Sequence, residues 1–202
     1  MVMNVFTVGL VFTEIGRTLK FADIVVIGSG SGKQRVRANG FGSGVCQIDD
    51  IKDISFFKEK PQKYYVLKPL FVTRSQFVYV PLNNEAQVSR IRPVASKKEA
   101  IALLDKLPID NCSWIEDRNE RKATFTDIIV NGSREDIVGL IYLINRHAEK
   151  LAKEGKHLNA QDERALIDAR NRMNNEIAVA LNMEPDGVVE LIHEKTGLED
   201  FA

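Results

Sequence analysis

The chain has 202 residues, of which 28% are charged and 44% hydrophobic, and its 28 Lys and Arg residues balance its 28 Asp and Glu residues. No apolar run approaches the roughly eighteen residues that a membrane span requires, and a net charge of zero excludes nucleic-acid binding through bulk charge alone. The two cysteines, Cys46 and Cys112, lack any metal-ligand spacing, so we expect two free thiols in a cytoplasmic protein.

The first half of the chain predicts a small sheet or barrel. β-branched and aromatic residues gather there in short runs, which is the pattern of strands. The runs are 44–51, 53–58, 64–70 and 75–82. The last two runs are close enough in sequence to form a hairpin. The run 75–82 is expected to leave the sheet at Pro81, because proline cannot donate a hydrogen bond to a neighbouring strand.

The glycine-rich stretch "VVIGSGSGKQ" (25–34) has the composition of a phosphate-binding loop but the wrong spacing. Such a loop needs four residues between its first glycine and the Gly-Lys pair, followed by Ser or Thr. Gly28 lies one residue too close, and Gln34 replaces the hydroxyl residue. The histidines share no ligand spacing and no nucleophile motif is found. We therefore expect no enzyme, no catalytic residue, no metal and no cofactor.

The second half of the chain predicts an all-α bundle of about five helices joined by short loops. Ser96 is expected to cap the first helix. Ser113 and Glu116 form an S-x-x-E capping box, so the second helix is expected to begin at Trp114. The other expected boundaries are a stop at Asn131 and Gly132, caps at Ser133 and Asn159, a stop near Gly155, and a last helix from Pro185 to Gly197.

Trp114 is the only tryptophan, and it opens a strongly charged segment. One interpretation is structural: the ring packs against the preceding loop or the next helix. The other is functional, because an exposed aromatic ring beside Arg118, Arg121 and Lys122 suits nucleic acid. The ring would stack or wedge while the cations hold phosphates.

Acidic residues and a second basic face complicate the functional interpretation. Glu116, Asp117 and Glu120 are interleaved with the cations, although acids in a first helical turn also interact favourably with the helix dipole. A second basic face is expected at Arg146 and Lys150, and it is either a solvated helix surface or a further contact for nucleic acid.

Five motifs occur in an order and spacing that are specific only when taken together. They are "GSGVCQIDDI" (42–51), "YYVLKPL" (64–70), "VYVPLNN" (78–84), "WIEDRNERK" (114–122) and "LNAQDERALIDARNRMNNEIAVAL" (158–181). Together they resemble the CarD/CdnL group of bacterial transcription regulators, which is related to the polymerase-binding module of the transcription-repair coupling factor. The helical motifs are similar to those of Firmicutes-type members, and the resemblance covers about residues 40–195.

The resemblance implies an α+β fold with a small N-terminal Tudor-like β-barrel (40–95) followed by a C-terminal all-α helical bundle (96–202), while residues 1–39 do not align cleanly. It implies that the barrel binds the RNA polymerase β subunit and that the bundle touches promoter DNA at the upstream edge of the melted region. In that family a tryptophan wedges into the minor groove and helps to hold the bubble open, and Trp114 falls on its position. The residues expected to bind DNA are Trp114, Arg118, Arg121, Lys122, Arg146 and Lys150.

The sequence departs from the family pattern in three places. First, the N-terminal segment 1–39 is longer than in the family, and either 5–8 or 21–30 supplies the first strand. Glu116 and Asp117 stand where many relatives carry arginines, and arginines that some relatives direct at polymerase are replaced. The polymerase contact is therefore expected to be more apolar and to rest on strand addition at an edge formed by 52–58 or 76–80. The residues expected to bind polymerase are Ile54, Phe56, Phe57, Phe77 and Tyr79.

We therefore expect a monomeric, non-enzymatic transcription regulator that binds the RNA polymerase β subunit and promoter DNA and has no membrane partner. The alternative is a protein-interaction module that binds polymerase or a repair factor without touching DNA, and the acids beside Trp114 motivate it. A third interpretation is an enzyme that binds a nucleotide at "GSGSGK", against which the loop spacing argues.

Overall fold

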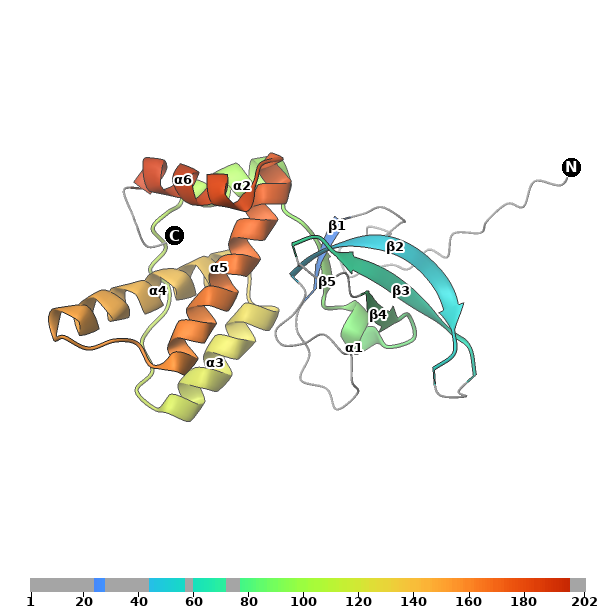
Figure 1. Cartoon of the computed structure of the whole chain (residues 1–202), viewed down its shortest axis with the longest axis horizontal. Helices are drawn as coiled ribbons and strands as arrows, with labels where there is room; N and C mark the ends of the chain where they lie inside the picture. The colour runs from blue at the N-terminus through green and yellow to red at the C-terminus, as the bar shows by residue number, and fades with distance from the viewer. Residues whose placement is uncertain (1–23, 28–43, 57–59, 72–76, 197–202) are drawn as a thin grey trace, which may run out of the picture. The chain divides into compact units, whose positions relative to one another are not determined.

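The structure, a computed structural model, describes residues 24–27, 44–56, 60–71 and 77–196. The chain divides into two compact units, Met1–Pro93 and Val94–Ala202, which we call the sheet unit and the helical unit. Figure 1 shows that strands dominate the first and helices the second, so the fold is mixed α and β with the strands first. The alternative first strand at 5–8 and the glycine-rich loop lie outside the described residues.

The sheet unit contains one antiparallel sheet with the strand order β4-β3-β2-β1-β5. Its elements are β1 (Ile24–Ile27), β2 (Gly44–Ile54), β3 (Gln62–Pro69), β4 (Val78–Pro81), the short helix α1 (Glu85–Val88) and β5 (Ile91–Pro93). Within the described residues, the edge strands β4 and β5 do not pair with each other. The sheet is therefore open there, and the expected closure into a barrel is not seen.

The strand predictions are confirmed in outline and wrong in some boundaries. The run 75–82 contains β4, and the run 64–70 lies mostly within β3, which begins two residues earlier, at Gln62; the two strands pair antiparallel as expected of a hairpin. The runs 44–51 and 53–58 are not separate strands, because β2 extends from Gly44 to Ile54 and covers the first run and the beginning of the second. Among the described residues the first strand is β1, which lies within 21–30.

A β-bulge in β2 decides which of its side chains face the core. The register with β3 shifts between Ile48 and Asp50, so Asp49 is an extra residue in the ladder. The shift moves the alternation by one position, and Ile51 therefore packs against the same core as Ile48. The buried residues of this core are Val25, Ile27, Cys46, Ile48, Tyr65, Leu67, Val78, Val80, Val88 and Ile91.

The helical unit is built around one central helix. Its helices are α2 (Lys97–Leu104), α3 (Arg118–Asn131), α4 (Arg134–Lys153), α5 (Ala160–Leu181) and α6 (Pro185–Thr196). The central helix is α5, which packs against each of the other four. Most predicted boundaries are confirmed: Ser96 and Ser133 form complete capping boxes, and Asn159 caps α5.

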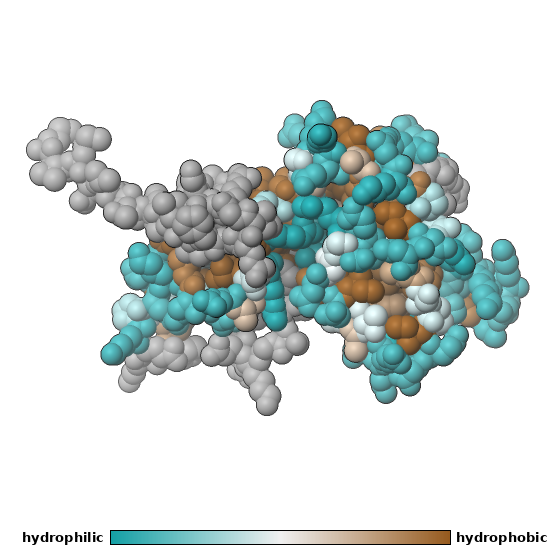
Figure 2. Space-filling view, turned by 180° about the vertical axis from the view of Figure 1, so that it is seen from behind, coloured by the Kyte–Doolittle hydropathy of each residue, from teal (hydrophilic) through white to brown (hydrophobic). Residues whose placement is uncertain are grey.

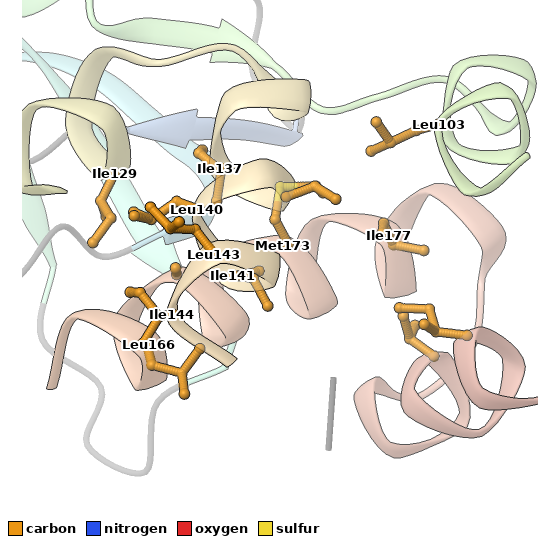
Figure 3. Close-up of a cluster of buried hydrophobic side chains, with 14 of the residues drawn as sticks. Leu103, Ile129, Ile137, Leu140, Ile141, Leu143, Ile144, Leu166, Met173 and Ile177 are labelled. Carbon is orange, nitrogen blue, oxygen red and sulfur yellow. The ribbon is translucent and has the colours of Figure 1, made fainter. Parts of the chain in front are cut away.

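The core of the helical unit lies mainly between α4 and α5. Figure 3 shows isoleucine and leucine side chains of α4 meeting Leu166, Met173 and Ile177 of α5. Ile141 is 0% exposed, and it lies on the apolar face of α4 that the sequence period predicts. None of the described helices is both long and apolar enough to cross a bilayer.

A buried carboxylate holds the beginning of the helical unit in place. Glu176 of α5 is 0% exposed and accepts hydrogen bonds from the Ala95 N–H (3.0 Å) and from Arg134 Nε (2.8 Å). These bonds tie the residue just before the Ser96 cap to the central helix. They also compensate the cost of removing the carboxylate from water.

The core assignment predicts different costs for the same substitution at two isoleucines. Replacing Ile141 by alanine should destabilise the helical unit by about 2–5 kcal/mol, because it removes buried methylenes and leaves a cavity. The control is Ile167→Ala on α5, which is 42% exposed and should change stability by less than about 0.5 kcal/mol. Urea unfolding monitored by circular dichroism measures both, and equal losses would contradict this assignment of the core.

Candidate functional site

Helix α3 begins four residues later than the sequence pattern predicts. The N-cap is Asp117, whose Oδ1 accepts hydrogen bonds from the Asn119 N–H (2.9 Å) and the Glu120 N–H (2.8 Å). The predicted start at Trp114 with a Ser113 cap is therefore wrong. Aspartate is as good an N-cap as serine, and residues 114–116 are held in a non-helical segment by other bonds.

Those other bonds come from Arg121, which is a structural residue and not a DNA contact. Its guanidinium forms a buried ion pair with Asp162 of α5, through Nε (3.1 and 3.2 Å) and Nη2 (3.0 Å). Its Nη1 donates to the carbonyl oxygens of Ile115 (2.7 Å) and Glu116 (3.0 Å). Arg121 is 6% exposed, so its predicted role in binding phosphates is wrong.

The loop that carries Trp114 is also tied to α4. Asn111 Nδ2 donates to Asp136 Oδ1 (3.3 Å), and the exposed pair Asp110–Arg146 spans 2.5 Å. Gly139 makes room for the loop, because a Cβ there would lie 1.7 Å from Asn111 Oδ1. The loop before α3 is therefore attached to α3, α4 and α5 together.

The Trp114 ring rests on three neighbours from two helices. The imidazole of His147 stacks on it with the ring centroids 3.4 Å apart and the planes inclined by 12°. Phe125 meets it edge-on at 5.9 Å, and Arg121 Cζ lies over the ring, 4.7 Å from its centroid. The packing interpretation is thus correct in part, but the ring is only partly buried. No residue that the structure describes accepts a hydrogen bond from its indole N–H.

Exposed cations lie on the same two helices as the neighbours of this ring. Arg118 begins α3, Lys122 follows one turn later, and Lys150 lies one turn after His147 on α4. None of the three forms an ion pair with a residue that the structure describes. Arg146 is also exposed, but it pairs with Asp110. On the face shown in Figure 2, hydrophobic residues form separate small patches among hydrophilic ones, which suits a polar partner.

The charge of His147 depends on the same neighbourhood. Burial lowers the pKa of its imidazole below 6.5, and the cations Lys150 and Arg121 lower it further, while Asp162 and Glu116 oppose the shift. The ring is therefore neutral at neutral pH. Sequence reasoning missed His147 because a lone histidine on a helix gives no pattern, and only the fold brings it to Trp114.

A second candidate surface lies on the face of the sheet opposite the core described above. Phe56 meets Tyr64 of β3 edge-on at 5.3 Å and Tyr79 of β4 at 5.5 Å. Tyr64 is 7% exposed and supports the other two rings from within, whereas Phe56 and Tyr79 are half-buried. Ile54 lies on the same face of the sheet as Tyr64, because it stands two positions along β2 from the residue that pairs with Tyr64. The structure thus brings three of the predicted polymerase-binding residues to one face. Phe77 is 39% exposed just before β4, and Phe57 lies outside the described residues.

The edge strand β4 offers backbone groups for pairing. The Leu82 N–H donates to the Lys63 carbonyl (2.9 Å), so hydrogen-bonded positions towards β3 recur at Val80 and Val78. The N–H and C=O of Tyr79 therefore point away from β3. In the described part of the chain no other strand pairs with this edge. Pro81 also fits an edge strand, because its missing N–H would point the same way.

Other chemistry finds little support in the described residues. Neither cysteine forms a disulfide bond, and burial raises the pKa of the Cys46 thiol to about 12, which makes it a poor nucleophile. No group of three or more potential metal ligands occurs among the described residues.

Comparison with known proteins supplies no identity. No family model matches the chain, and no curated protein matches it. The resemblance to the CarD family therefore rests on the motifs alone.

Breaking the Arg121–Asp162 pair should be expensive. The variant Arg121→Met leaves a buried carboxylate unpaired and should lose about 3–5 kcal/mol of stability, while Trp114 emission in the native state shifts to the red. The control Lys106→Met breaks an exposed pair with Glu135 and should lose less than about 1 kcal/mol.

Urea unfolding with fluorescence detection measures both variants. The double variant Arg121→Met/Asp162→Leu should recover much of the loss, because it removes the stranded charge as well. A single variant as stable as the control would show that the pair does not support the loop.

Proposed function

We propose that the chain is a non-enzymatic, CarD-type transcription regulator of the bacterial cytoplasm that acts as a monomer. Its sheet unit, as a Tudor-like barrel, binds the RNA polymerase β subunit, and its helical unit contacts promoter DNA and stabilises the open complex. The observation that carries the proposal is the position of Trp114: the ring is stacked on His147 yet stays partly exposed, and the helices that hold it carry exposed cations with no ion-pair partner among the described residues.

Strand addition at β4 supports the polymerase contact. Backbone hydrogen bonds to an added strand give affinity without requiring particular side chains, while side chains beside the edge give specificity. The groups available are the backbone of Tyr79 and the half-buried rings of Phe56 and Tyr79, which the buried Tyr64 supports from within. An apolar surface of this kind suits a partner strand that presents alternate apolar residues.

A weak contact with DNA is sufficient for this function. A short tether raises the local concentration of the second site to about millimolar, so a helical unit held on polymerase needs little affinity of its own. Arg118, Lys122 and Lys150 supply phosphate contacts, and the exposed part of Trp114 meets the DNA where it melts. A wedge costs a few kcal/mol per unstacked step. Where the base pairs are already separating, part of that unstacking has already occurred, so the contact stabilises the open complex relative to the closed one.

A second candidate is a protein-interaction module that binds polymerase or a repair factor and leaves DNA alone. The observation that favours it is the loss of Arg121 to an internal ion pair, which leaves the exposed acids Glu116, Asp117 and Glu120 facing fewer cations. Under this candidate the Trp114 ring only closes the gap between α3 and α4.

The variant Trp114→Ala tests the proposal. It should shorten the lifetime of open promoter complexes while leaving binding to the isolated β subunit unchanged, because the two contacts lie on different units. The variant Trp114→Phe should retain part of the stabilisation of open complexes. Open complexes as long-lived with the alanine variant as with wild type would favour the second candidate.

Salt dependence separates the two candidates further. Each phosphate contact adds about one unit to the slope of log affinity against log salt. Charge reversal at Arg118 and Lys122 should therefore reduce the salt slope of the promoter–polymerase complex, and an unchanged slope would again favour the second candidate.

The edge-strand contact is tested by Tyr79→Pro. Proline removes the N–H that points away from β3 and leaves the bonds between β3 and β4 intact, so the sheet unit should fold but no longer bind the polymerase β subunit. The control Tyr79→Ala loses the same ring but keeps the N–H, and it should bind more weakly than wild type but measurably. A pull-down with the β subunit, checked by circular dichroism, measures both. Undiminished binding of the proline variant would refute strand addition at β4.

A further inference from the structure

We infer that His147 is a positioning residue for the Trp114 contact, and that it holds the indole in place only as the neutral imidazole. Protonation of His147 would then release the ring and weaken the DNA contact. The functional half of this inference rests on the proposed function, whereas the structural half concerns the protein alone.

The geometry gives His147 control over the plane of the indole. The two ring centroids are 3.4 Å apart and the planes are nearly parallel, so the imidazole covers part of one face of the indole. Phe125 touches the ring edge-on and Arg121 lies at a greater distance. His147 is itself fixed, because it belongs to α4, whose neighbouring turns are buried in the core. The part of the indole that stays exposed is therefore set by where His147 stands.

The charges around His147 oppose its protonation. Lys150 on its own helix and Arg121 on α3 are cations, and Asp162 on α5 and Glu116 in the loop are anions that partly offset them. Asp162 is already engaged in the buried pair with Arg121. A proton on His147 would place a third cation beside the two already present, in a site where burial also disfavours charge.

A protonated His147 would also be attracted to the face of the indole, because a cation interacts favourably with an aromatic ring. That attraction is worth about 0.5–1 kcal/mol at exposed sites. Burial and the cations Lys150 and Arg121 act in the opposite direction and lower the pKa of His147. In the unfolded chain His147 gains its proton as the pH falls through about 6.5, whereas in the folded chain it does so only at a lower pH. The stack therefore loses stability in that acidic range.

The single tryptophan makes the stack directly measurable in the full chain. Emission excited selectively at Trp114 should shift to the red as the pH falls from about 8 to about 5, with a midpoint below the ordinary histidine value of about 6.5. The variant His147→Phe keeps an aromatic ring but cannot titrate, so its emission should not change. The matched control His157→Phe alters an exposed histidine and should titrate like wild type. Circular dichroism at each pH verifies that the helices persist.

Open-complex lifetimes then test the functional half. The gain in lifetime that the wild-type chain provides should fall on acidification, whereas the gain provided by His147→Phe should stay constant, and His147→Ala should give a reduced gain at every pH. Flat wild-type emission, or a red shift retained in His147→Phe, would overturn the inference whatever the function. A normal emission titration combined with no effect of Trp114→Ala on open complexes would leave the stack intact and refute the proposed function instead.

Discussion

The buried ion pair between Arg121 and Asp162 is the interaction on which the candidate DNA-binding surface depends. One guanidinium joins α3 to the beginning of α5 and, through two carbonyl oxygens, keeps the segment after Trp114 out of the helix. A pair of this kind contributes little net stability over an apolar replacement, but it tolerates the loss of neither partner. Its value here is geometric, since it decides where α3 begins and therefore where the indole lies.

This constraint changes how the surface would work. A tryptophan at the tip of a helix would be free on both faces, whereas Trp114 has one face covered by His147 and an edge against Phe125. A ring held in this way loses little conformational freedom on binding, which favours a contact that is weak but well oriented. Such a contact suits the proposed function, in which the sheet unit is held by another partner and a chain of zero net charge needs little affinity of its own for DNA.

The sequence predicts local features well and long-range features poorly. The caps at Ser96, Ser133 and Asn159 are read correctly because capping involves residues only three positions apart. The same rule fails at Ser113, because the competing bonds come from Arg121, whose side chain is held by Asp162, 41 positions further along the chain. His147 and the β2 bulge at Asp49 are likewise products of tertiary pairing that no local period encodes. The residues expected to bind polymerase come from the family resemblance and from the expected strand edges, and the fold places Ile54, Phe56 and Tyr79 on one face.

The bond between Glu176 and the Ala95 N–H has a consequence for dividing the protein into fragments. Strand β5 ends at Pro93 and Ala95 is already fastened inside the helical unit, so Val94 is the one residue between them. A recombinant helical fragment that starts at the visible beginning of α2, Lys97, would omit both the Ser96 cap and the main-chain donor for a fully enclosed carboxylate. A helical fragment should therefore begin at Val94, three positions before α2.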